Sequence, residues 1–221
     1  MAVRDPEDRL REEYFRLLPD MLQISGRLKT QVEYTLLPVV RTLASHESVA
    51  VKVRVKDCVS AIDKLRRKQE SGIFYSEIDE SYSLLSVRDL VGIRVLAFPP
   101  GRVVEVDSLL RSLFPDWKSD SAWMFDSDTG DASPQRAFKY NGFHEGSPIP
   151  CEYQVVSTLT GLFWEVEHAA IYKQAPNFKG LEPMMRNETD AVYRALHAFE
   201  DEFERKIRES QHSDPTSSTK F

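Results

Sequence analysis

Four side chains of types that bind phosphate groups stand close together in the first third of the sequence: Arg54, Lys56, Ser60 and Lys64. The last three are four residues apart, so on a helix that begins near residue 56 they lie on one face. Two ammonium groups and a hydroxyl at a strand-to-helix junction can cradle a polyphosphate, assisted by the helix dipole. The spacing is equally typical of a solvated basic helix face, because residues 66–68 continue the positive charge.

Two carboxylates accompany apolar segments that have the pattern of buried strands. Asp89 precedes the run from Leu90 to Phe98, the clearest buried-strand pattern in the chain. A carboxylate there can hold a Mg2+ ion that bridges phosphate oxygens, and it can equally cap a loop or helix end. Glu152 shares a strand face with Gln154, and its burial is costly unless it is paired or binds a metal. An edge strand with one wet face is the alternative explanation.

Aromatic and histidine side chains form two further candidate sites. The segment 139–144, Lys-Tyr-Asn-Gly-Phe-His, offers Tyr140 as a stacking surface, and its glycine permits a close backbone approach. Trp164, His168 and Tyr172 fall on one face of a predicted helix. That second pattern is also typical of an amphipathic helix that packs on a core.

Composition restricts the class of protein. The 221 residues are 41% hydrophobic, enough for one well-filled core, and 29% charged, with a formal net charge of −6. We expect a soluble, cytoplasmic protein, and the acidic balance argues against a general charge-driven nucleic-acid binder. No apolar run approaches the roughly 18–20 residues that cross a bilayer, and the start of the chain lacks the apolar stretch of a secretion signal. The two cysteines stand apart and match no metal or redox spacing.

Periodicity predicts helices interleaved with strands in one domain over residues 1–209. The predicted helices span 6–46, 57–70, about 104–113, 158–174 and 182–209. The predicted strands span 49–56, 90–98, 137–144 and 150–156. We expect Pro19 and Gly26 to divide the first helix, and the polar segment 210–221 to form a disordered tail. This order predicts an α/β or α+β domain with a sheet of four or five strands. Walker-type phosphate loops, dinucleotide-binding glycine fingerprints, zinc helices and nucleophile elbows are absent from the sequence.

Taken in order, these segments resemble the synthetase domain of the RelA/SpoT family, in particular its small alarmone synthetases. Five motifs between about residues 35 and 175 carry the resemblance. They are Arg54-x-Lys56-x-x-x-Ser60-x-x-x-Lys64, Asp89-Leu-Val-Gly-Ile-Arg94, the Tyr140 to His144 spacing, Glu152-Tyr-Gln154, and Trp164 to Lys173 with its Glu-His and Tyr-Lys pairs. The resemblance implies a nucleotidyltransferase-like α/β (α+β) fold, with a mixed sheet of about five strands flanked by helices and long N- and C-terminal helices.

The resemblance also implies an ATP-dependent pyrophosphokinase reaction. The 3′-hydroxyl of GDP or GTP attacks the β-phosphorus of ATP, takes the diphosphate to form the alarmone (p)ppGpp, and releases AMP. Positioning and charge neutralisation carry this chemistry more than covalent catalysis does. Asp89 and Glu152 would be the catalytic carboxylates that hold Mg2+, with Glu152 also a candidate base for the hydroxyl.

The remaining roles divide between the two substrates. The residues expected to bind ATP are Arg54, Lys56, Ser60, Lys64, Arg94 and Arg102. Of these, the lysines and the serine would grip the phosphates, and one or two arginines would stack on adenine. The residues expected to contact the acceptor are Lys139, Tyr140, His144 and Gln154. Here the tyrosine would stack on the base and the histidine would reach the phosphates.

The acceptor side departs from the family pattern. Members that use GDP or GTP carry Gly-Tyr-Arg-Ser-x-His, whereas Asn141 and Gly142 stand here in place of the Arg and Ser. The strand after Glu152 also lacks the Arg of Glu-x-Gln-x-Arg-Thr. Two other acceptors therefore stay open: the 3′-CCA end of tRNA, whose modification would block aminoacylation and translation, and an adenine nucleotide, which would give (p)ppApp. An inactive fold used as a binding module is disfavoured, because the carboxylates and lysines are retained.

The resemblance extends to partners. No adjacent His-Asp pair of the family's hydrolase half is present, so we expect synthesis without hydrolysis. The long terminal helices could assemble a homotetramer, as small alarmone synthetases do, or could bind an antitoxin partner. We expect no membrane partner.

Overall fold

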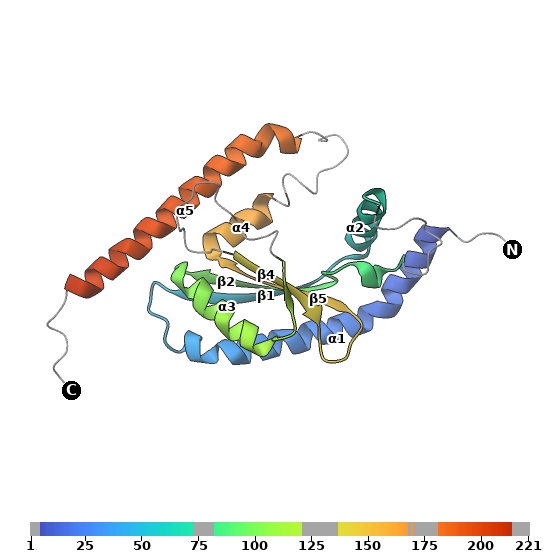
Figure 1. Ribbon diagram of the computed structural model, residues 1–221, viewed down its shortest axis with the longest axis horizontal. Coiled ribbons are helices and arrows are strands. Elements are labelled where there is room, and N and C mark those ends of the chain that lie inside the picture. Colours follow the sequence, from blue (N-terminus) through green and yellow to red (C-terminus); the bar gives the residue numbers. More distant parts are fainter. Residues whose placement is uncertain (1–4, 73–81, 121–136, 168, 170–180, 214–221) are drawn as a thin grey trace.

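The computed structural model describes residues 5–72, 82–120, 137–167, 169 and 181–213 (Figure 1). Within these residues the helices are α1 (Pro6–Val40), α2 (Cys58–Glu70), α3 (Gly101–Leu113), α4 (Thr158–Glu167) and α5 (Leu181–Ser213), with a 3-10 turn η1 (Leu84–Ser86). The strands are β1 (Ser48–Val55), β2 (Val91–Phe98), β3 (Lys118–Ser119), β4 (Ala137–Phe143) and β5 (Pro150–Ser157). None of these helices combines the length and apolar character that crossing a membrane requires.

All five strands join one mixed sheet in the order β1-β2-β5-β4-β3. β2 and β5 are parallel, whereas β1 pairs with β2, and β4 with β5 and β3, in antiparallel fashion. The parallel pair occupies the centre, and every residue of β5 is buried, as expected for a strand covered on both faces. The predicted mixed sheet of about five strands is confirmed. The prediction missed β3, because two residues are too short to show a periodic signal.

The two faces of the sheet are covered by different helices (Figure 1). α1 and α3 pack on one face, which we call the lower face, and α4 packs on the opposite, upper face together with α5. The lower face contains the main apolar core, which includes Leu28, Val32, Ile93, Val95, Leu110 and Tyr153. Each fully buried Val or Leu side chain contributes about 1.5–3 kcal/mol. The upper face is apolar only where α4 and α5 cover it, around Leu96, Ala137, Val156, Trp164 and Tyr193.

α1 is one continuous helix, so the expectation that Pro19 and Gly26 divide it is wrong. Asp5 caps the start of the helix by accepting a hydrogen bond from the backbone N–H of Glu7 at 2.9 Å, and Pro6 occupies the first turn, where no N–H is needed. Buried residues then recur every three or four positions along the face turned to the sheet. Packing of that long face outweighs the roughly 3 kcal/mol that a proline costs inside a helix.

The C-terminal helices differ from the prediction at their ends. α4 is described over Thr158–Glu167, and the predicted helix end at 174 lies outside the described residues. α5 continues to Ser213, past the predicted start of the tail at 210, and its last turns carry ion pairs such as Arg205 with Glu202 and Glu209. Residues 214–221 lie outside the described part of the chain.

α5 is tied to the rest of the domain at two places. Near its middle, the Tyr193 hydroxyl donates to the Glu167 carboxylate of α4 at 2.6 Å. Further along, Glu204 accepts a hydrogen bond from the Gly101 N–H at 2.8 Å. That N–H begins α3, where Pro100 supplies no side-chain cap, so α5 satisfies the first turn of α3 from outside.

Asp107 of α3 is a carboxylate in the lower-face core, only 3% exposed. The Tyr140 hydroxyl donates to its Oδ2 at 3.3 Å, and the Tyr140 ring stacks on Tyr153 with ring centroids 4.6 Å apart. Within the described residues, Asp107 Oδ1 and the Tyr153 hydroxyl make no hydrogen bond. Burial raises the pKa of Asp107 to about 6, against the opposing effects of Arg111 and the Tyr140 hydrogen bond.

We expect Asp107→Asn to stabilise the protein at pH 8 by about 1–2 kcal/mol and to lose most of this advantage towards pH 4. The raised pKa means that Asp107 contributes its full stability below its ordinary pKa of 3.8 and loses it as the pH rises through about 6. Urea unfolding of both proteins at a series of pH values measures the difference. The exposed Asp116→Asn is the control, and an effect of Asp107→Asn that is the same at pH 4 and pH 8 would contradict the prediction.

Candidate functional site

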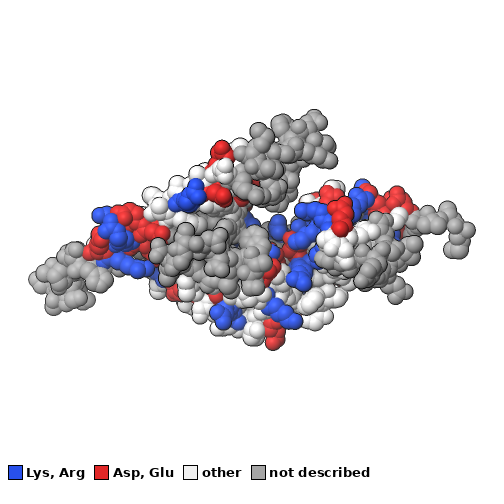
Figure 2. Space-filling view, turned by 45° about the horizontal axis from the view of Figure 1, so that its top comes forward, with Lys and Arg blue, Asp and Glu red and all other residues white. Residues whose placement is uncertain are grey.

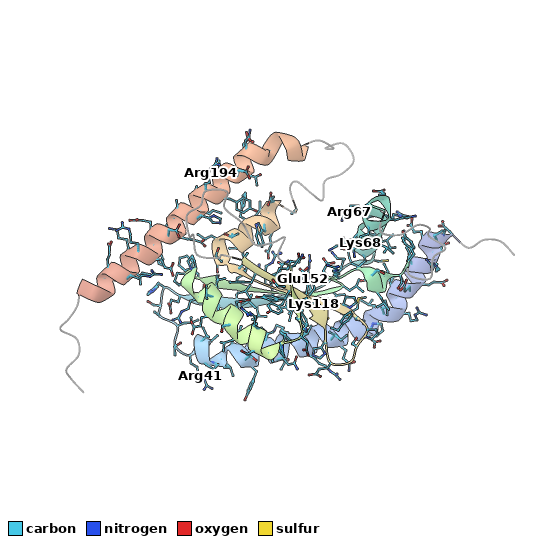
Figure 3. The ribbon with its side chains drawn as sticks, viewed as in Figure 1. Arg41, Arg67, Lys68, Lys118, Glu152 and Arg194 are labelled. Carbon is cyan, nitrogen blue, oxygen red and sulfur yellow. The ribbon has the colours of Figure 1, made fainter. Side chains whose placement is uncertain are left out.

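The register of the sheet aligns polar side chains into two rows on the upper face. The first row, which we call the site row, has one residue from every strand: Arg54, Gly92, Glu152, Asn141 and Lys118. The second row lies two residues along each strand and contains Lys52, Arg94, Gln154 and Lys139. Neighbouring members of a row are on adjacent strands, about 5 Å apart. Figure 3 shows Glu152 and Lys118 near the middle of the molecule, with Lys68 and Arg67 on α2 to one side.

Asp89, just before β2, is the centre of a charged cluster. Its side chain is 5% exposed and lies between Lys56 Nζ, 2.9 Å from Oδ2, and Lys64 Nζ, 2.8 Å from Oδ1. Arg54 Nη2 donates to Oδ2 at 3.2 Å. The backbone holds this arrangement, because the Lys56 N–H donates to the Leu90 carbonyl at 2.9 Å and so ties the end of β1 to the start of β2. We call these four side chains, Arg54, Lys56, Lys64 and Asp89, the Asp89 cluster.

The Asp89 cluster carries an excess of positive charge. Burial acts to raise the pKa of Asp89, but Lys56 and Lys64 outweigh it and lower that pKa to about 2. Burial lowers the pKa of Lys56, while Asp89 opposes the shift. Asp89 is therefore ionised at neutral pH, and three cations face one carboxylate. Basic and acidic side chains gather beside α2 on this side of the molecule in Figure 2. Such a cluster favours a polyanionic ligand.

Ser60 and Lys64 lie one turn apart on α2, but Lys56 precedes the helix. The predicted stack of three residues on one helix face is therefore wrong, since α2 begins at Cys58 and Lys56 approaches Asp89 from the end of β1. Asp57 caps α2 by accepting a hydrogen bond from the Ser60 N–H at 2.9 Å. The cap occupies part of the helix N-terminus that was expected to assist phosphate binding.

Gly92 gives Arg54 its path to Asp89. The Cβ of any larger residue at position 92 would lie 3.1 Å from Arg54 Nε, so the arginine crosses directly over the glycine backbone. The Arg54 side chain remains 49% exposed. Its guanidinium plane can therefore stack on a ring while its edge stays bound to the carboxylate.

Glu152 lies in the middle of the site row on a central strand and is only 3% exposed. Lys139 Nζ lies 3.0 Å from its Oε2, and Gln154 Nε2 donates to its Oε1 at 2.6 Å. Gln154 Oε1 in turn accepts from Arg94 Nε at 2.9 Å. The edge-strand explanation of Glu152 is therefore wrong. The carboxylate is buried, paired and held by a chain of hydrogen bonds that reaches the second row.

Three residues near the site were not anticipated from the sequence: Asp120, Glu165 and Lys118. Asp120 Oδ2 lies 3.5 Å from Lys139 Nζ, so this ammonium faces two carboxylates. Glu165 of α4 binds Lys52 Nζ at 2.8 Å and lies 3.7 Å from Arg94 Nη1. Only the pairing of β3 with β4 and the docking of α4 bring these side chains to the site, and neither leaves a local signal in the sequence.

The Arg94 side chain is more enclosed than its expected role, stacking on adenine, requires. Its guanidinium lies 5.8 Å from the ring centre of Trp164, and burial lowers its pKa. Trp164 is 8% exposed in the upper apolar cluster, which fits the core-helix interpretation of its motif. The two residues that were expected to share its helix face, His168 and Tyr172, lie outside the described residues.

Tyr140 and His144 are not brought together with Glu152. Tyr140 lies on the lower face, because side chains alternate along β4 and it points opposite to Lys139 and Asn141. His144 follows β4 and contacts α1, which covers the lower face. Tyr140 is 7% exposed and is held by Asp107. His144 is buried, with Nε2 3.0 Å from Gln31 Oε1 of α1, beside a groove of about 520 Å3 along that helix. The acceptor contacts expected of these two residues do not fit this arrangement.

Arg102 also stands apart from the site. It lies on α3, after the C-terminal end of β2, whereas Asp89 precedes the start of that strand. Its guanidinium binds Glu47 Oε2 at 2.6 Å, and this hydrogen bond is the main cause of its raised pKa. Arg102 holds the corner between β1 and α3 together, so a contact with adenine does not fit its position.

The two buried carboxylates are oxygen donors of the kind that Mg2+ prefers. Among the described residues, no group of three or more His, Cys, Asp or Glu side chains converges on one point. Mg2+ commonly takes only one or two protein carboxylates and fills its shell with phosphate oxygens and water. Asp89 and Glu152 are buried oxygen donors of the type that Mg2+ binds, and each is now neutralised by ammonium groups at 2.8–3.0 Å.

We expect Asp89→Asn to lower the free energy of unfolding by about 2 kcal/mol at pH 7, because two partly buried lysines lose their counter-charge. Since the pKa of Asp89 is depressed, its stabilisation is present above 3.8 and declines as the pH falls towards about 2. The loss should therefore shrink between pH 7 and pH 3 in urea unfolding. Asp63→Asn, an exposed change on α2, should have little effect. An equal loss in both variants would count against the cluster.

Comparison by sequence finds no matching protein-family model and no matching curated protein. Comparison by structure finds strong similarity. Small alarmone synthetase 1 from Bacillus subtilis has a TM-score of 0.60 at 17% identity, covering 90% of this chain and 99% of that one. A GTP pyrophosphokinase family protein from Streptococcus pneumoniae has a TM-score of 0.60 at 20% identity over 90% and 96%. Small alarmone synthetase 2 from Bacillus subtilis has a TM-score of 0.56 at 15% identity over 86% and 97%. This chain has the fold of the small alarmone synthetases.

Proposed function

We propose that this protein is an ATP-dependent pyrophosphokinase that transfers diphosphate from ATP to the 3′-hydroxyl of GDP or GTP. The products are (p)ppGpp and AMP. The observation that carries the proposal is the sheet row that places a cation-rich cluster around Asp89 beside the buried carboxylate of Glu152. The fold supports it, because the similar small alarmone synthetase 1 from Bacillus subtilis has been solved with AMPCPP and with its product pppGpp.

The Asp89 cluster is suited to bind ATP, the diphosphate donor. Lys56 and Lys64 approach Asp89 from two different elements and leave Arg54 exposed above them. In the proposed complex the two lysines exchange Asp89 for oxygens of the ATP phosphates, and Arg54 stacks on the adenine. Mg2+, held by Asp89 and Glu152, would supply neutralisation of the phosphate charge. Each lysine exchanges a carboxylate for phosphate oxygens, so its positive charge stays neutralised in a half-buried site.

Glu152 is suited to accept the proton of the acceptor's 3′-hydroxyl. Gln154 and Lys139 bind one oxygen each and orient the carboxylate. In the proposed step the 3′-oxygen forms a bond to the β-phosphorus as its proton passes to Glu152. The bond from that phosphorus to the α–β bridging oxygen breaks, and its electron pair leaves with AMP. Orientation by two partners lets Glu152 accept the proton without rearranging.

A second acceptor, the 3′-terminal adenosine of tRNA, is favoured by one observation. Tyr140, the residue expected to stack on guanine, is buried on the other face of the sheet. The net charge of −6 favours a mononucleotide instead, because phosphodiester binding draws on many cations. We therefore place GDP or GTP first, tRNA second, and an adenine nucleotide third.

The direct test offers γ-labelled ATP and magnesium together with GDP, GTP, ATP or bulk tRNA in separate reactions. We expect label on GDP or GTP, with one AMP released for each transfer. Label on tRNA alone would replace the alarmone with the tRNA reaction, and label on ATP alone would replace it with the adenine product. Absence of both label transfer and AMP with every acceptor would remove the enzymatic function altogether.

Glu152→Gln should reduce transfer at least a hundredfold while ATP affinity, measured by calorimetry without Mg2+, changes little, since an amide cannot accept the hydroxyl proton. Lys64→Ala should instead weaken ATP binding. Glu105→Gln, on α3 away from the site row, is the matched control and should retain full activity. A Glu152→Gln enzyme with normal turnover would exclude Glu152 as the base.

A further inference from the structure

The first turns of α1 lie beside two segments that hold parts of the Asp89 cluster (Figure 1). α2 carries Lys64, and η1 is separated from Asp89 only by residues 87 and 88. Both elements contact α1, and they also contact each other. This end of α1 contributes no member of the cluster, yet it touches the elements that place the members.

Tyr14 of α1 binds the backbone of Lys56. Its side chain is 6% exposed, and its hydroxyl donates to the Lys56 carbonyl at 3.1 Å. On the other side, the Lys56 N–H donates to the Leu90 carbonyl at 2.9 Å. Lys56 lies between β1 and α2, outside any regular element. Because both of its backbone polar groups are bound, the direction in which its ammonium group points towards Asp89 is fixed.

Glu13, next to Tyr14 in the chain, binds the start of η1. Its Oε1 accepts hydrogen bonds from the Ser83 hydroxyl and from the Leu84 N–H, the latter at 3.2 Å. Ser83 in turn caps η1 by accepting a hydrogen bond from the Leu85 N–H at 3.2 Å. One carboxylate oxygen of α1 therefore holds the turn that leads into Asp89.

Two further contacts join the beginning of α1 to the same elements. Arg9 Nη2 donates to the Tyr82 carbonyl at 2.9 Å, and its guanidinium lies 6.0 Å from the centre of the Tyr82 ring. Glu7 forms an ion pair with Arg66 of α2. Four side chains between residues 7 and 14 thus bind the end of β1, α2 and η1, the three segments around the cluster.

We propose that Tyr14 and Glu13 are positioning residues for polyphosphate binding by the Asp89 cluster. Tyr14 acts through the backbone of Lys56, and Glu13 acts through η1, which sets the position of Asp89. A group that is already held in its binding position loses less conformational freedom when the ligand arrives, so affinity is higher. This inference rests on the proposed function, because it takes the polyphosphate to be that of ATP.

Tyr14→Phe removes only the hydroxyl that binds Lys56. It should raise the Kd for ATP, measured by calorimetry, about twofold to tenfold, the range that one net hydrogen bond gives. The KM for ATP should rise by the same factor, while the KM for GDP stays unchanged. Tyr34→Phe, the same substitution at a 76% exposed position of α1, is the matched control and should alter none of these constants.

The affinity separates positioning from stability. A contact that only stabilises the fold changes the fraction of active protein, and therefore the apparent kcat, without changing the Kd of the folded molecules. An unchanged Kd for ATP in Tyr14→Phe would therefore overturn the role of Tyr14. So would an equal rise in Tyr34→Phe.

Glu13→Ala should also weaken ATP binding several-fold, and Glu13→Gln should restore most of the affinity, because an amide oxygen still accepts the two hydrogen bonds. Asp20→Ala removes an exposed carboxylate from the same helix and should have no effect. Wild-type affinity in Glu13→Ala would overturn the role of Glu13. Equally weak binding in Glu13→Gln and Glu13→Ala would overturn it too, since the charge would then carry the effect.

A double-variant cycle tests whether Tyr14 acts through Lys56. Inorganic triphosphate is the ligand, since its binding needs neither adenine contacts nor diphosphate transfer. In a Lys56→Ala background, Tyr14→Phe should have little further effect, because the side chain that it positions is gone. An equal loss of affinity in both backgrounds would overturn the proposal. Wild-type protein that binds triphosphate and transfers no label would overturn only the proposed function, whereas failure to bind triphosphate or ATP would overturn both.

Discussion

The need to neutralise buried carboxylates on one face of the sheet organises this molecule. Asp89 is 5% exposed at the start of a central strand, where an unpaired charge would cost several kcal/mol. Lys56 and Lys64 meet that need from two separate elements, so the end of β1, the first turns of α2 and the start of β2 are drawn to one point. The same contacts that stabilise the fold assemble a cation-rich centre. The electrostatic requirement that stabilises the fold therefore also forms the candidate site.

Because side chains alternate across the sheet, one face packs against helices and the other carries the polar residues of the candidate site. The lower face binds α1 and α3 through apolar contacts, while the site row occupies the part of the upper face that α4 and α5 leave uncovered. Glu152 can be buried because its own strand neighbours, Lys139 and Gln154, share its face. The polar partners of Glu152 thus come from the register of the strands, and a shift of one residue would send these groups into the apolar core.

Local patterns predicted the residues whose position follows from their own strand or helix. The positions of Asp89 and Glu152 were predictable, because a carboxylate beside a run of apolar residues is conspicuous and period-two alternation fixes its face. Their catalytic roles stay predictions. Tyr140 and His144 were misplaced, because a spacing of four shows that two residues share a face without showing which face. The pairing of β4 with β5 and the contact with Asp107 decide that question. Arg102 and Lys118 depended on tertiary distance, which no local pattern contains.

The Asp89 cluster and the exposed residues of the outer strands differ in how well they tolerate substitution. Asp89 is 5% exposed and Lys56 11%, so replacing the carboxylate leaves buried positive charge uncompensated and costs stability. Phe143 and Lys118 are exposed at the outer strands, where a substitution leaves the packing of the core intact. The Asp89 cluster is therefore tied to folding, whereas these exposed side chains are not. A fold built this way can keep its buried charged centre while the exposed residues at the edge of the sheet change.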